Sequence, residues 1–528
     1  MKIFTASKMA AILVFTAIVS NSAVFAVQPG VQLSFLGTYR AGTYNMGAAE
    51  IVAHDSQTHR LFVVNGATRK IDVLDATVPS APVLLFSIDL SLYGRSANSV
   101  DVKNGIVAVA VEAAVKTDNG KVVFFDTNGA FINAVTVGAL PDMVVFTPNG
   151  EKILVANEGE PNDDYSIDPE GSVSIIDLSN GVLNATVATA DFYGFNNAVL
   201  DPSIRIFGLN ANVARDLEPE YIAVSHNSKT AWVTLQENNA MGILDLKSGQ
   251  FTKLVGLGFK NHNDNKNKLD ASDRPATGTP RGTIDIRNWP VFGMYQPDGI
   301  APIKYRNQTF VITANEGDAR DYVGLKEEAR VKDLPLDMGV FGDIATLKSE
   351  LNLGRLTVTN TLGNTDADPE YEALYSFGAR SFSIWNAEGM QIFDSGDTIE
   401  QLTADIFPNF FNASSTNNNR DSRSPSKGPE PEGVAVGKAY GRTYAFIGLE
   451  RIGGILVYDV TNPYAPTYTQ YINNRNFTAA TNTALAGDLA PEGLHFISED
   501  DSPIGIPLLV VANEVSGTTT IYEFSKAD

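Results

Sequence analysis

The sequence predicts an all-β fold, namely a seven-bladed β-propeller of four-stranded blades with its long loops on one face. The first observation is composition: 528 residues that are 44% hydrophobic, with 44 Gly, 18 Tyr and 28 Phe, favour strands joined by tight turns. The second is a repeated unit, in which an acidic start precedes two apolar strands. The third is a repeated pentapeptide, because VANEG at 155–159, TANEG at 313–317 and VANEV at 511–515 each end such a run.

The repeated unit occurs seven times along the chain. Its clearest copy has two strands joined by the turn TPNG and a third strand, SVSIIDL. One copy is split, with two strands at 297–317 and two more at 380–396. The complete set of copies lies at 49–76, 98–129, 141–181, 219–249, 297–396, 431–460 and 491–524. Such regularity predicts blades around an axis, whereas a β-sandwich array with similar turns is the alternative.

The last copy stops after its third strand. The apolar stretch at 31–39, which precedes the first copy, is expected to supply the missing fourth strand and to close the ring by pairing the two chain ends. Closure of this kind protects sheet edges. We therefore expect residues 27–528 to form a single domain, with insertions near 191–217, 258–296, 317–379 and 395–427.

Residues 1–26 have the features of a secretory signal peptide. Lys2 and Lys8 precede a short apolar run, and the small-residue site VFA predicts cleavage after Ala26. The run is too short for a membrane anchor. No second apolar span and no sorting tail follow, so we expect a secreted or periplasmic protein without a transmembrane segment. With no Cys in the chain, disulfides cannot contribute to stability.

The formal net charge is −22, and residues 1–26 contain two Lys and no acidic residue, so the remainder carries −24. Such a chain repels nucleic acid and anionic membranes, and it suits divalent cations as partners. A generally acidic, soluble surface is the alternative interpretation. We expect a monomer.

Acidic residues recur at two equivalent places in the units. The start of the first strand and the end of the second strand lie at the same end of an antiparallel pair, next to the predicted channel mouth. Strand-one starts carry Glu50, Asn98, Asp142, Glu220, Asp298, Glu432 and Glu492. Strand-two ends carry Asn65, Glu112, Glu158, Glu237, Glu316, Glu450 and Glu514.

Gathered carboxylates repel one another, and a hard cation such as Ca²⁺ would relieve the repulsion with oxygen ligands. Arg or Lys side chains could do the same, or each acid could pin neighbouring blades by accepting backbone hydrogen bonds. The predicted metal ligands are Asp142, Glu158, Glu220, Glu237, Asp298, Glu316, Glu432, Glu450, Glu492 and Glu514.

Basic residues near the same face are the candidates for catalysis, namely Arg320, Lys427 and Arg380. Arg320 lies in the acidic segment 315–322, and Arg380 lies in a second acidic segment, 366–385. Both segments flank one insertion, so we expect them to meet.

The polar loop at 261–275 lacks the central Gly and the final Glu of an EF-hand. A looser oxygen site with Asp264, Asp270 and Asp273 is possible there, and a solvated loop is the alternative.

Several enzyme classes find no support in the sequence. No Cys nucleophile, GxSxG elbow, P-loop or dinucleotide fingerprint occurs. The five His residues form no HExxH pattern, so a zinc hydrolase is poorly supported. Metal-assisted hydrolysis on carboxylate-held ions is the class that remains.

Five longer motifs resemble the choice-of-anchor I family, which is similar to mesenchyme-specific cell-surface glycoproteins of sea-urchin skeletogenic cells. These motifs are LPDMVVFTPNGEKILVANEGEPNDDY, TANEGDARDY, DADPEYEALYSFGARSFSIWN, KGPEPEGVAVG and DLAPEGLHFI. The resemblance implies an exported propeller and, for animal members, an association with calcium or biomineral. Bacterial relatives are often labelled alkaline phosphatase-like.

Two functions follow as hypotheses. The first is a cation-binding module that is secreted or associated with the extracellular matrix or cell surface. The second is a metal-dependent phosphoesterase, similar in logic to calcium-dependent propeller phytases, with Arg320 holding a phosphate-bearing ligand.

Overall fold

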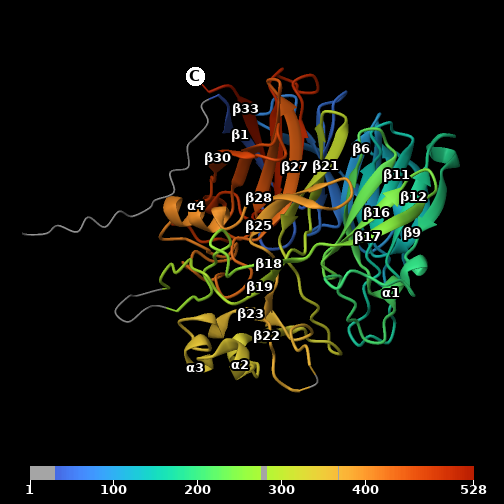
Figure 1. The fold of residues 1–528 in the computed structure, drawn as a ribbon. Helices are drawn as coiled ribbons and strands as arrows, with labels where there is room; N and C mark the ends of the chain where they lie inside the picture. Colours follow the sequence, from blue (N-terminus) through green and yellow to red (C-terminus); the bar gives the residue numbers. More distant parts are fainter. Residues whose placement is uncertain (1–29, 275–281, 367, 528) are drawn as a thin grey trace, which may run out of the picture.

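The computed structural model describes residues 30–274, 282–366 and 368–527 (Figure 1). The predicted signal peptide lies outside the described residues. Within them, the fold is all-β and consists mostly of four-stranded antiparallel sheets, as the sequence predicts. The four-strand unit read from the sequence is the unit of the structure.

Seven four-stranded sheets occur in the described residues. The first three are β2 (Val52–Asp55), β3 (Arg60–Asn65), β4 (Lys70–Asp75) and β5 (Val83–Asp89); β6 (Ala97–Lys103), β7 (Ile106–Val111), β8 (Asn119–Asp126) and β9 (Phe131–Ala139); and β10 (Pro141–Phe146), β11 (Lys152–Asn157), β12 (Ser172–Asp177) and β13 (Thr186–Ala190).

The next three sheets are β14 (Pro219–Val224), β15 (Thr230–Leu235), β16 (Ala240–Asp245) and β17 (Gln250–Gly256); β20 (Ile300–Tyr305), β21 (Gln308–Asn315), β25 (Ser381–Asn386) and β26 (Gln391–Asp394); and β27 (Pro431–Ala439), β28 (Arg442–Leu449), β29 (Ile455–Asp459) and β30 (Thr467–Ile472).

The last sheet contains both ends of the described chain. It is built from β31 (Pro491–Ile497), β32 (Leu508–Asn513), β33 (Thr518–Ser525) and the N-terminal strand β1 (Gln32–Arg40). β1 runs antiparallel to β33, with Gln32 opposite Ser525 and Arg40 opposite Thr518, and its register shifts between Phe35 and Gly37.

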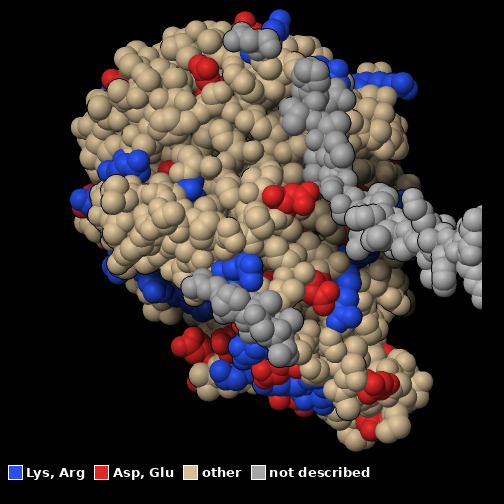
Figure 2. All heavy atoms as spheres, turned by 90° about the vertical axis from the view of Figure 1, so that its left-hand side faces the viewer, with Lys and Arg blue, Asp and Glu red and all other residues tan. Residues whose placement is uncertain are grey.

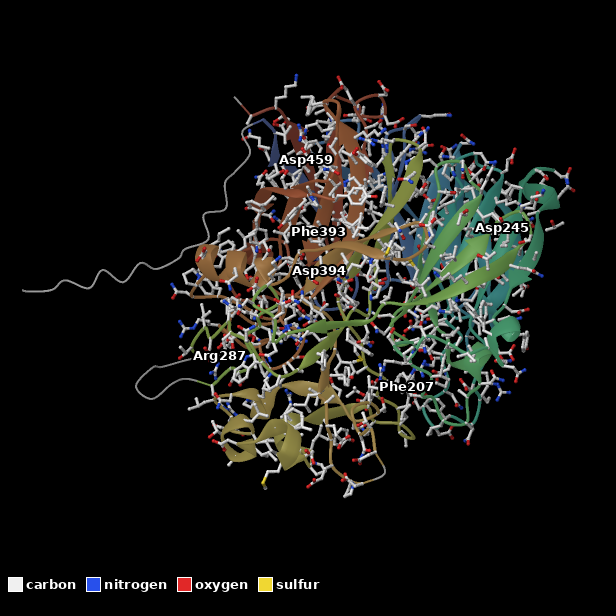
Figure 3. All side chains as sticks on the ribbon, viewed as in Figure 1. Phe207, Asp245, Arg287, Phe393, Asp394 and Asp459 are labelled. Atoms are coloured by element: carbon white, nitrogen blue, oxygen red, sulfur yellow. The ribbon has the colours of Figure 1, made fainter. Side chains whose placement is uncertain are left out.

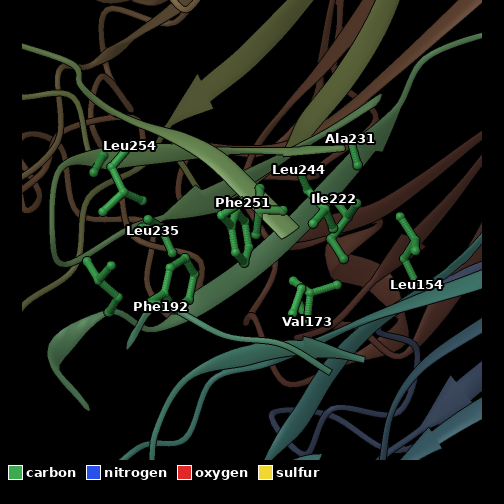
Figure 4. Close-up of a cluster of buried hydrophobic side chains, with 14 of the residues drawn as sticks. Leu154, Val173, Phe192, Ile222, Ala231, Leu235, Leu244, Phe251 and Leu254 are labelled. Carbon is green, nitrogen blue, oxygen red and sulfur yellow. The ribbon is translucent and has the colours of Figure 1, made fainter. Parts of the chain in front are cut away.

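The first strands of the sheets contact one another in cyclic order: β2, β6, β10, β14, β20, β27, β31 and again β2. Apolar side chains fill the space between neighbouring sheets. In one such cluster, Leu154 and Val173 of one sheet pack against Ile222 and Leu244 of the next (Figure 4). Because both faces of each sheet are covered, inner strands such as β7 (sequence IVAVAV) are almost wholly apolar.

The long connections follow β11, β13, β17, β21, β26 and β30, and they therefore all leave from one end of the sheets, as the sequence predicts. The described parts of these connections and insertions contain four short α-helices: α1 (Val213–Asp216), α2 (Met338–Phe341), α3 (Ile344–Leu347) and α4 (Thr398–Ile406). Single 3₁₀ turns occur at Val182–Asn184, Tyr193–Phe195, Val331–Asp333, Leu353–Arg355 and Ala484–Ala486.

Two insertions, predicted near 258–296 and 317–379, together build a five-stranded sheet. Its strands are β18 (Phe259–Asn261), β19 (Phe292–Met294), β24 (Tyr375–Ser376), β23 (Thr357–Thr359) and β22 (Glu328–Arg330). This inserted module has its own apolar cluster around Trp289, Leu353 and Val358. It projects below the other sheets in Figure 1, and Figure 2 shows acidic and basic side chains interspersed over that lower part.

The two acidic segments that flank the insertion do meet, as predicted. Asn315 is paired with Ser381 between β21 and β25, and the backbone N–H of Ala379 donates to the carbonyl oxygen of Asn315 at 3.3 Å. Their two arginines, however, take part in different contacts, described below.

Candidate functional site

A cavity of about 250 Å³ lies where the first strands begin and the second strands end. Eight of the ten predicted metal ligands line it: Asp142, Glu158, Glu220, Glu237, Asp298, Glu316, Glu432 and Glu492. We call this the acidic cavity. The other two, Glu450 and Glu514, do not line it, and neither do Glu50 and Glu112.

Four of these eight acids are positioned by an irregularity at the start of a first strand. The register of β10, β14, β27 and β31 shifts between the proline that opens each strand and the third residue after it. Such a bulge leaves residues out of the ladder and re-aims their side chains. The residues that directly follow the four prolines are Asp142, Glu220, Glu432 and Glu492, and all four line the cavity.

A second repeated device holds the ends of the second strands. Leu140, Glu430 and Ala490 each precede a strand-opening proline and have positive φ angles of 48°, 51° and 59°. Their carbonyl oxygens accept the backbone N–H groups of Glu158, Glu450 and Glu514 at 3.0, 2.9 and 2.8 Å. Left-handed backbone is costly for residues other than glycine, so the recurrence of this conformation indicates that the surrounding sheet enforces it.

The Asn of each Asn-Glu pair is structural. Asn157 is fully buried and its amide group donates to the hydroxyl oxygens of Ser172 and Ser174 at 3.2 and 3.0 Å. Asn315 donates in the same way to Ser381 and Ser383. In these two pairs the amide fastens strand two to strand three, and the acids that follow, Glu158 and Glu316, line the cavity.

Most carboxylates of the acidic cavity have no basic partner among the described residues, although Glu160 and Asp318, which also line it, pair with Lys116 and Lys427. Among the residues that the structure describes, Glu316 is the only one of the eight that forms an ion pair. Glu237 is only 7% exposed, and neither its Oε2 atom nor the buried Oε2 of Glu432 has a hydrogen-bond partner within the described part of the chain. Seven unpaired carboxylates around one small space carry a large unfavourable electrostatic energy.

The pKa values of these unpaired carboxyl groups are raised, because the groups are buried and lie close to other acids. Burial, followed by repulsion from Asp318, raises the pKa of Glu237 to about 8. Burial raises the pKa of Asp142 to about 7. Burial also holds the pKa of Glu158 and of Glu220 well above the usual range, with repulsion from Asp142 and from Glu158, respectively, as the next cause.

Two triads of carboxylates stand out within the cavity. One is Asp142, Glu158 and Glu220, and the other is Asp298, Glu316 and Glu432; in each, one oxygen per residue lies within 4.8 Å of the others. These distances and the all-oxygen donor set fit a hard cation such as Ca²⁺, because two ligands on one ion at 2.3–2.6 Å are at most about 5 Å apart.

The basic candidate Lys427 occupies one side of the cavity mouth. Its Nζ atom lies 2.7 Å from Oε1 of Glu316 and 3.3 Å from Oε2 of Glu430, and it also donates to the carbonyl oxygen of Gly317. Arg451 joins the same group, 2.9 Å from Glu430 and 2.6 Å from Glu450. The second triad is therefore partly neutralised, whereas no Lys or Arg pairs with Asp142, Glu158 or Glu220 in the described residues.

The other two basic candidates, Arg320 and Arg380, form ion pairs and hydrogen bonds that fix loops in place. Arg320 is buried, 2.7 Å from Oδ1 of Asp216 and 3.0 Å from Oε2 of Glu218, and its guanidinium lies 4.5 Å from the ring centroid of Phe207, which Figure 3 labels on the side of the inserted module. Arg380 is 2.7 Å from Oε1 of Glu400 and also donates to backbone carbonyls of the loop before β27.

The loop at 261–275 does not bring its three acids together. Asp270 accepts backbone N–H groups of Ser272 and Asp285, and Asp273 pairs with Arg355. Among the described residues, Asp264 accepts only the N–H of Lys266, at 3.3 Å, in a local turn.

Sequence reasoning missed two acids of the cavity, Glu160 and Asp318. Each lies two residues beyond a predicted ligand, in NEGE (157–160) and NEGD (315–318). The signal was therefore present as an extension of the repeated pentapeptide.

The four-stranded antiparallel sheets around an acidic cavity define a propeller-like, all-β protein. Residues 50–463 match the family described as the choice-of-anchor I domain, and the chain belongs to this family. Membership supports a surface-associated module.

Two curated proteins are similar in sequence. Gigasin-3a of Magallana gigas is 32% identical over 197 residues, which are 35% of this chain and 69% of that protein. The mesenchyme-specific cell surface glycoprotein of Strongylocentrotus purpuratus is 27% identical over 307 residues, which are 51% of this chain and only 38% of the glycoprotein.

Solved structures offer a weaker likeness. The β-propeller domain of Cps50 (Swd1) from Myceliophteria thermophila is 9% identical, with a TM-score of 0.43, and the alignment covers 93% of this chain and 99% of that one. The sheet topology described above, rather than this likeness, defines the fold. Among the described residues, no helix combines the length and the hydropathy that crossing a membrane requires.

Proposed function

We propose that this protein is a secreted or surface-associated β-propeller that binds divalent cations, Ca²⁺ above others, in the acidic cavity. In this proposal the seven four-stranded sheets are the blades of one closed ring, β1 completes the last blade, and residues 27–528 form a single domain that carries the inserted module. The cyclic contacts between first strands and the β1–β33 pairing support the ring.

The observation that carries the proposal is the triad Asp142, Glu158 and Glu220. Its oxygens lie within 4.8 Å of one another, it lines a cavity, and it has no basic partner in the described part of the chain. Unpaired Oε2 of Glu237 adds a further buried acceptor in the same cavity. A bound cation would satisfy these oxygens and remove the repulsion that otherwise forces some of them to hold protons.

Surface association is supported by the family and by the name of the sea-urchin relative, which describes a cell surface glycoprotein. A role in an extracellular matrix would use the cation as a bridge to phosphate-bearing or other acidic ligands.

The alternative, a phosphoric ester hydrolase, needs a basic side chain that is free to hold phosphate. Arg320, Arg380 and Lys427 all form ion pairs within the protein, so no observation favours this alternative. A p-nitrophenyl phosphate assay with Ca²⁺ and with EDTA separates the two functions: we expect no metal-dependent hydrolysis, and clear metal-dependent turnover would replace the binding proposal.

Cation binding is tested by calorimetric titration and by thermal unfolding of EDTA-treated protein with and without Ca²⁺. A cation at 100 times its dissociation constant stabilises the folded state by about 2.7 kcal/mol, so the melting temperature should rise. In the double variant Glu158→Gln and Glu220→Gln we expect this rise to disappear, while the metal-free protein becomes more stable than wild type because repulsion is removed.

Glu112→Gln is the matched control, since Glu112 occupies the equivalent strand-two position but lies outside the cavity. It should bind Ca²⁺ like the wild type. If the double variant still binds with wild-type affinity, or the wild type shows no binding, the proposal is wrong.

A further inference from the structure

A second cavity lies at the opposite end of the sheets, where the connections between strands are shorter than the long insertions of the acidic face. It has a volume of about 380 Å³ and is bordered by the β14–β15, β20–β21 and β25–β26 turns and by Tyr464, between β29 and β30. β14 begins at the acidic cavity with Glu220 and ends at this one, before Ser225. The two cavities therefore belong to opposite faces of the molecule.

The floor of this second cavity is rigid and aromatic. Trp232 and Phe310 are almost fully buried, and Nε1 of Trp232 donates to the carbonyl oxygen of Ala387 at 3.0 Å. Tyr464 is 55% exposed, yet edge-to-face contacts hold its ring 5.5 Å from Phe310 and 6.3 Å from Tyr305. An exposed ring that is already fixed loses little conformational entropy when a ligand packs against it.

The rim is rich in neutral polar side chains, many of whose hydrogen-bonding groups have no partner in the described part of the chain. The side chains of Thr230, Asn307, Gln308 and Thr309 make no hydrogen bond within the part of the chain that the structure describes. Asn227 and Asn386 use their oxygens on nearby turn groups and leave their NH₂ groups available. Amides and hydroxyls both donate and accept, which is what a polyhydroxylated ligand requires.

The charged residues of the lining indicate which class of ligand this second cavity can bind. Glu388 is the only charged residue of the lining, and no Lys or Arg borders the cavity. A phosphate or a carboxylate would find no counter-charge here, in a protein of net charge −22. A smaller adjoining cavity shares Asn227, Asn307, Gln308 and Thr309 and is completed by His226 and Lys304, so the polar rim continues beyond the first cavity toward two basic side chains.

We propose that this aromatic-floored groove, between the turns of neighbouring sheets, binds a neutral glycan, with one sugar ring against Tyr464 and its hydroxyls bonded to the Asn307–Thr309 turn. The volume lies at the lower end of the range for ligand pockets, enough for a mono- or disaccharide unit of a longer chain. The glycan site is independent of the acidic cavity.

The test is affinity electrophoresis of the intact protein in gels that contain laminarin, hydroxyethyl cellulose, dextran or galactomannan, with alginate as the acidic comparison. Binding to at least one neutral polysaccharide is expected, and EDTA should not abolish it. Calorimetry with the matching trisaccharide then gives the affinity. These probes also distinguish α-linked from β-linked chains.

Two variants probe the groove separately, Tyr464→Ala for the ring and the pair Asn307→Ala and Gln308→Ala for the rim. Each should weaken binding by roughly tenfold or more, which corresponds to about 1.4 kcal/mol. Tyr193→Ala is the matched control, because Tyr193 is 53% exposed but lies in a long connection on the other face, and it should bind like wild type.

Retardation by none of the neutral polysaccharides overturns the proposal. It is equally overturned if binding is confined to alginate, or if both groove variants bind as tightly as Tyr193→Ala. All these substitutions are at exposed or turn positions, and unchanged melting temperatures will show that the variants are folded.

Discussion

In the Asn-Glu pairs at the strand ends, the two adjacent residues have different structural roles. In the pair at 157–158, the Asn side chain points into the sheet and donates to two serines, whereas the Glu reaches the acidic cavity. Alternation of side chains along a strand places neighbours on opposite sides. Local geometry alone thus gives the two residues of this dipeptide different roles, a hydrogen-bond donor within the sheet and an acid that lines the cavity.

Asn157→Ala tests the structural half of the pair. The substitution leaves the hydroxyls of Ser172 and Ser174 with a lost donor in a buried position, so the free energy of unfolding should fall by roughly 2 kcal/mol. Urea denaturation measures it. Asn184→Ala, at an exposed Asn that donates only to the carbonyl oxygen of Asn180, should have little effect. Equal losses in the two variants would contradict a special role for Asn157.

Among the elements, β1 has the most consequential position, because it pairs the start of the described chain with its end. Its Leu33 is 1% exposed and packs in the apolar cluster shared with β28, β29, β32 and β33. The amide side chain of Gln470 on β30 also bonds both backbone groups of Leu33, at 2.7 and 3.0 Å. β1 is thus fastened to two sheets.

Leu33→Ala should therefore destabilise the protein by about 2–5 kcal/mol, the usual range for a buried leucine. Phe35→Ala on the same strand is the control, since Phe35 is 49% exposed, and its cost should be clearly smaller. Chemical denaturation curves compare them. If both variants unfold like wild type, β1 contributes little to the stability of the ring.

At the scale of the whole molecule, three histidines meet at the seam between the first and last sheets. The ring of His54 lies 6.1 Å from that of His59 and 6.2 Å from that of His495 on β31, and the buried Nε2 of His54 has no hydrogen-bond partner among the residues that the structure describes. Burial, then repulsion from His495, lowers the pKa of His54 to about 3, and burial lowers that of His495 to about 4. Asp55 and Asp501 face the same group and oppose the shift.

A histidine whose pKa is lower in the folded state binds more protons when unfolded, so its contribution to stability is complete above about pH 6.5 and is lost as the pH falls toward the folded value. Between about pH 7.5 and about pH 5, the wild type should therefore lose more unfolding free energy than His54→Gln, as measured by urea denaturation. Comparison with the variant cancels the opposite effect of the acidic cavity, whose carboxyls gain protons over the same range. Parallel losses in the two proteins would show that the seam is not sensitive to pH.

Most of the fold was predictable because it rests on local patterns. Alternating apolar strands, turns such as TPNG and the recurring acids at 142, 158, 220 and 237 are visible along the chain, and the same spacing predicted which ends of the strands lie together. The inserted module was not predicted as a sheet, because its strands are two or three residues long and one pair joins residues far apart in the sequence, as in β19 with β24, where Phe292 lies opposite Tyr375.

The sequence by itself determined the repeated antiparallel unit, the side on which the long connections lie and the identity of most acids in the cavity, since each depends on periodicity and order along the chain. Only the tertiary structure decided which charges meet. In the folded chain Arg320 pairs with Asp216 and Glu218, and Lys427 pairs with Glu316. The triad Asp142, Glu158 and Glu220 has no basic partner among the described residues. The reason is physical: electrostatic interactions depend on distance and burial in space, and residues a hundred positions apart acquire these only when the sheets pack together.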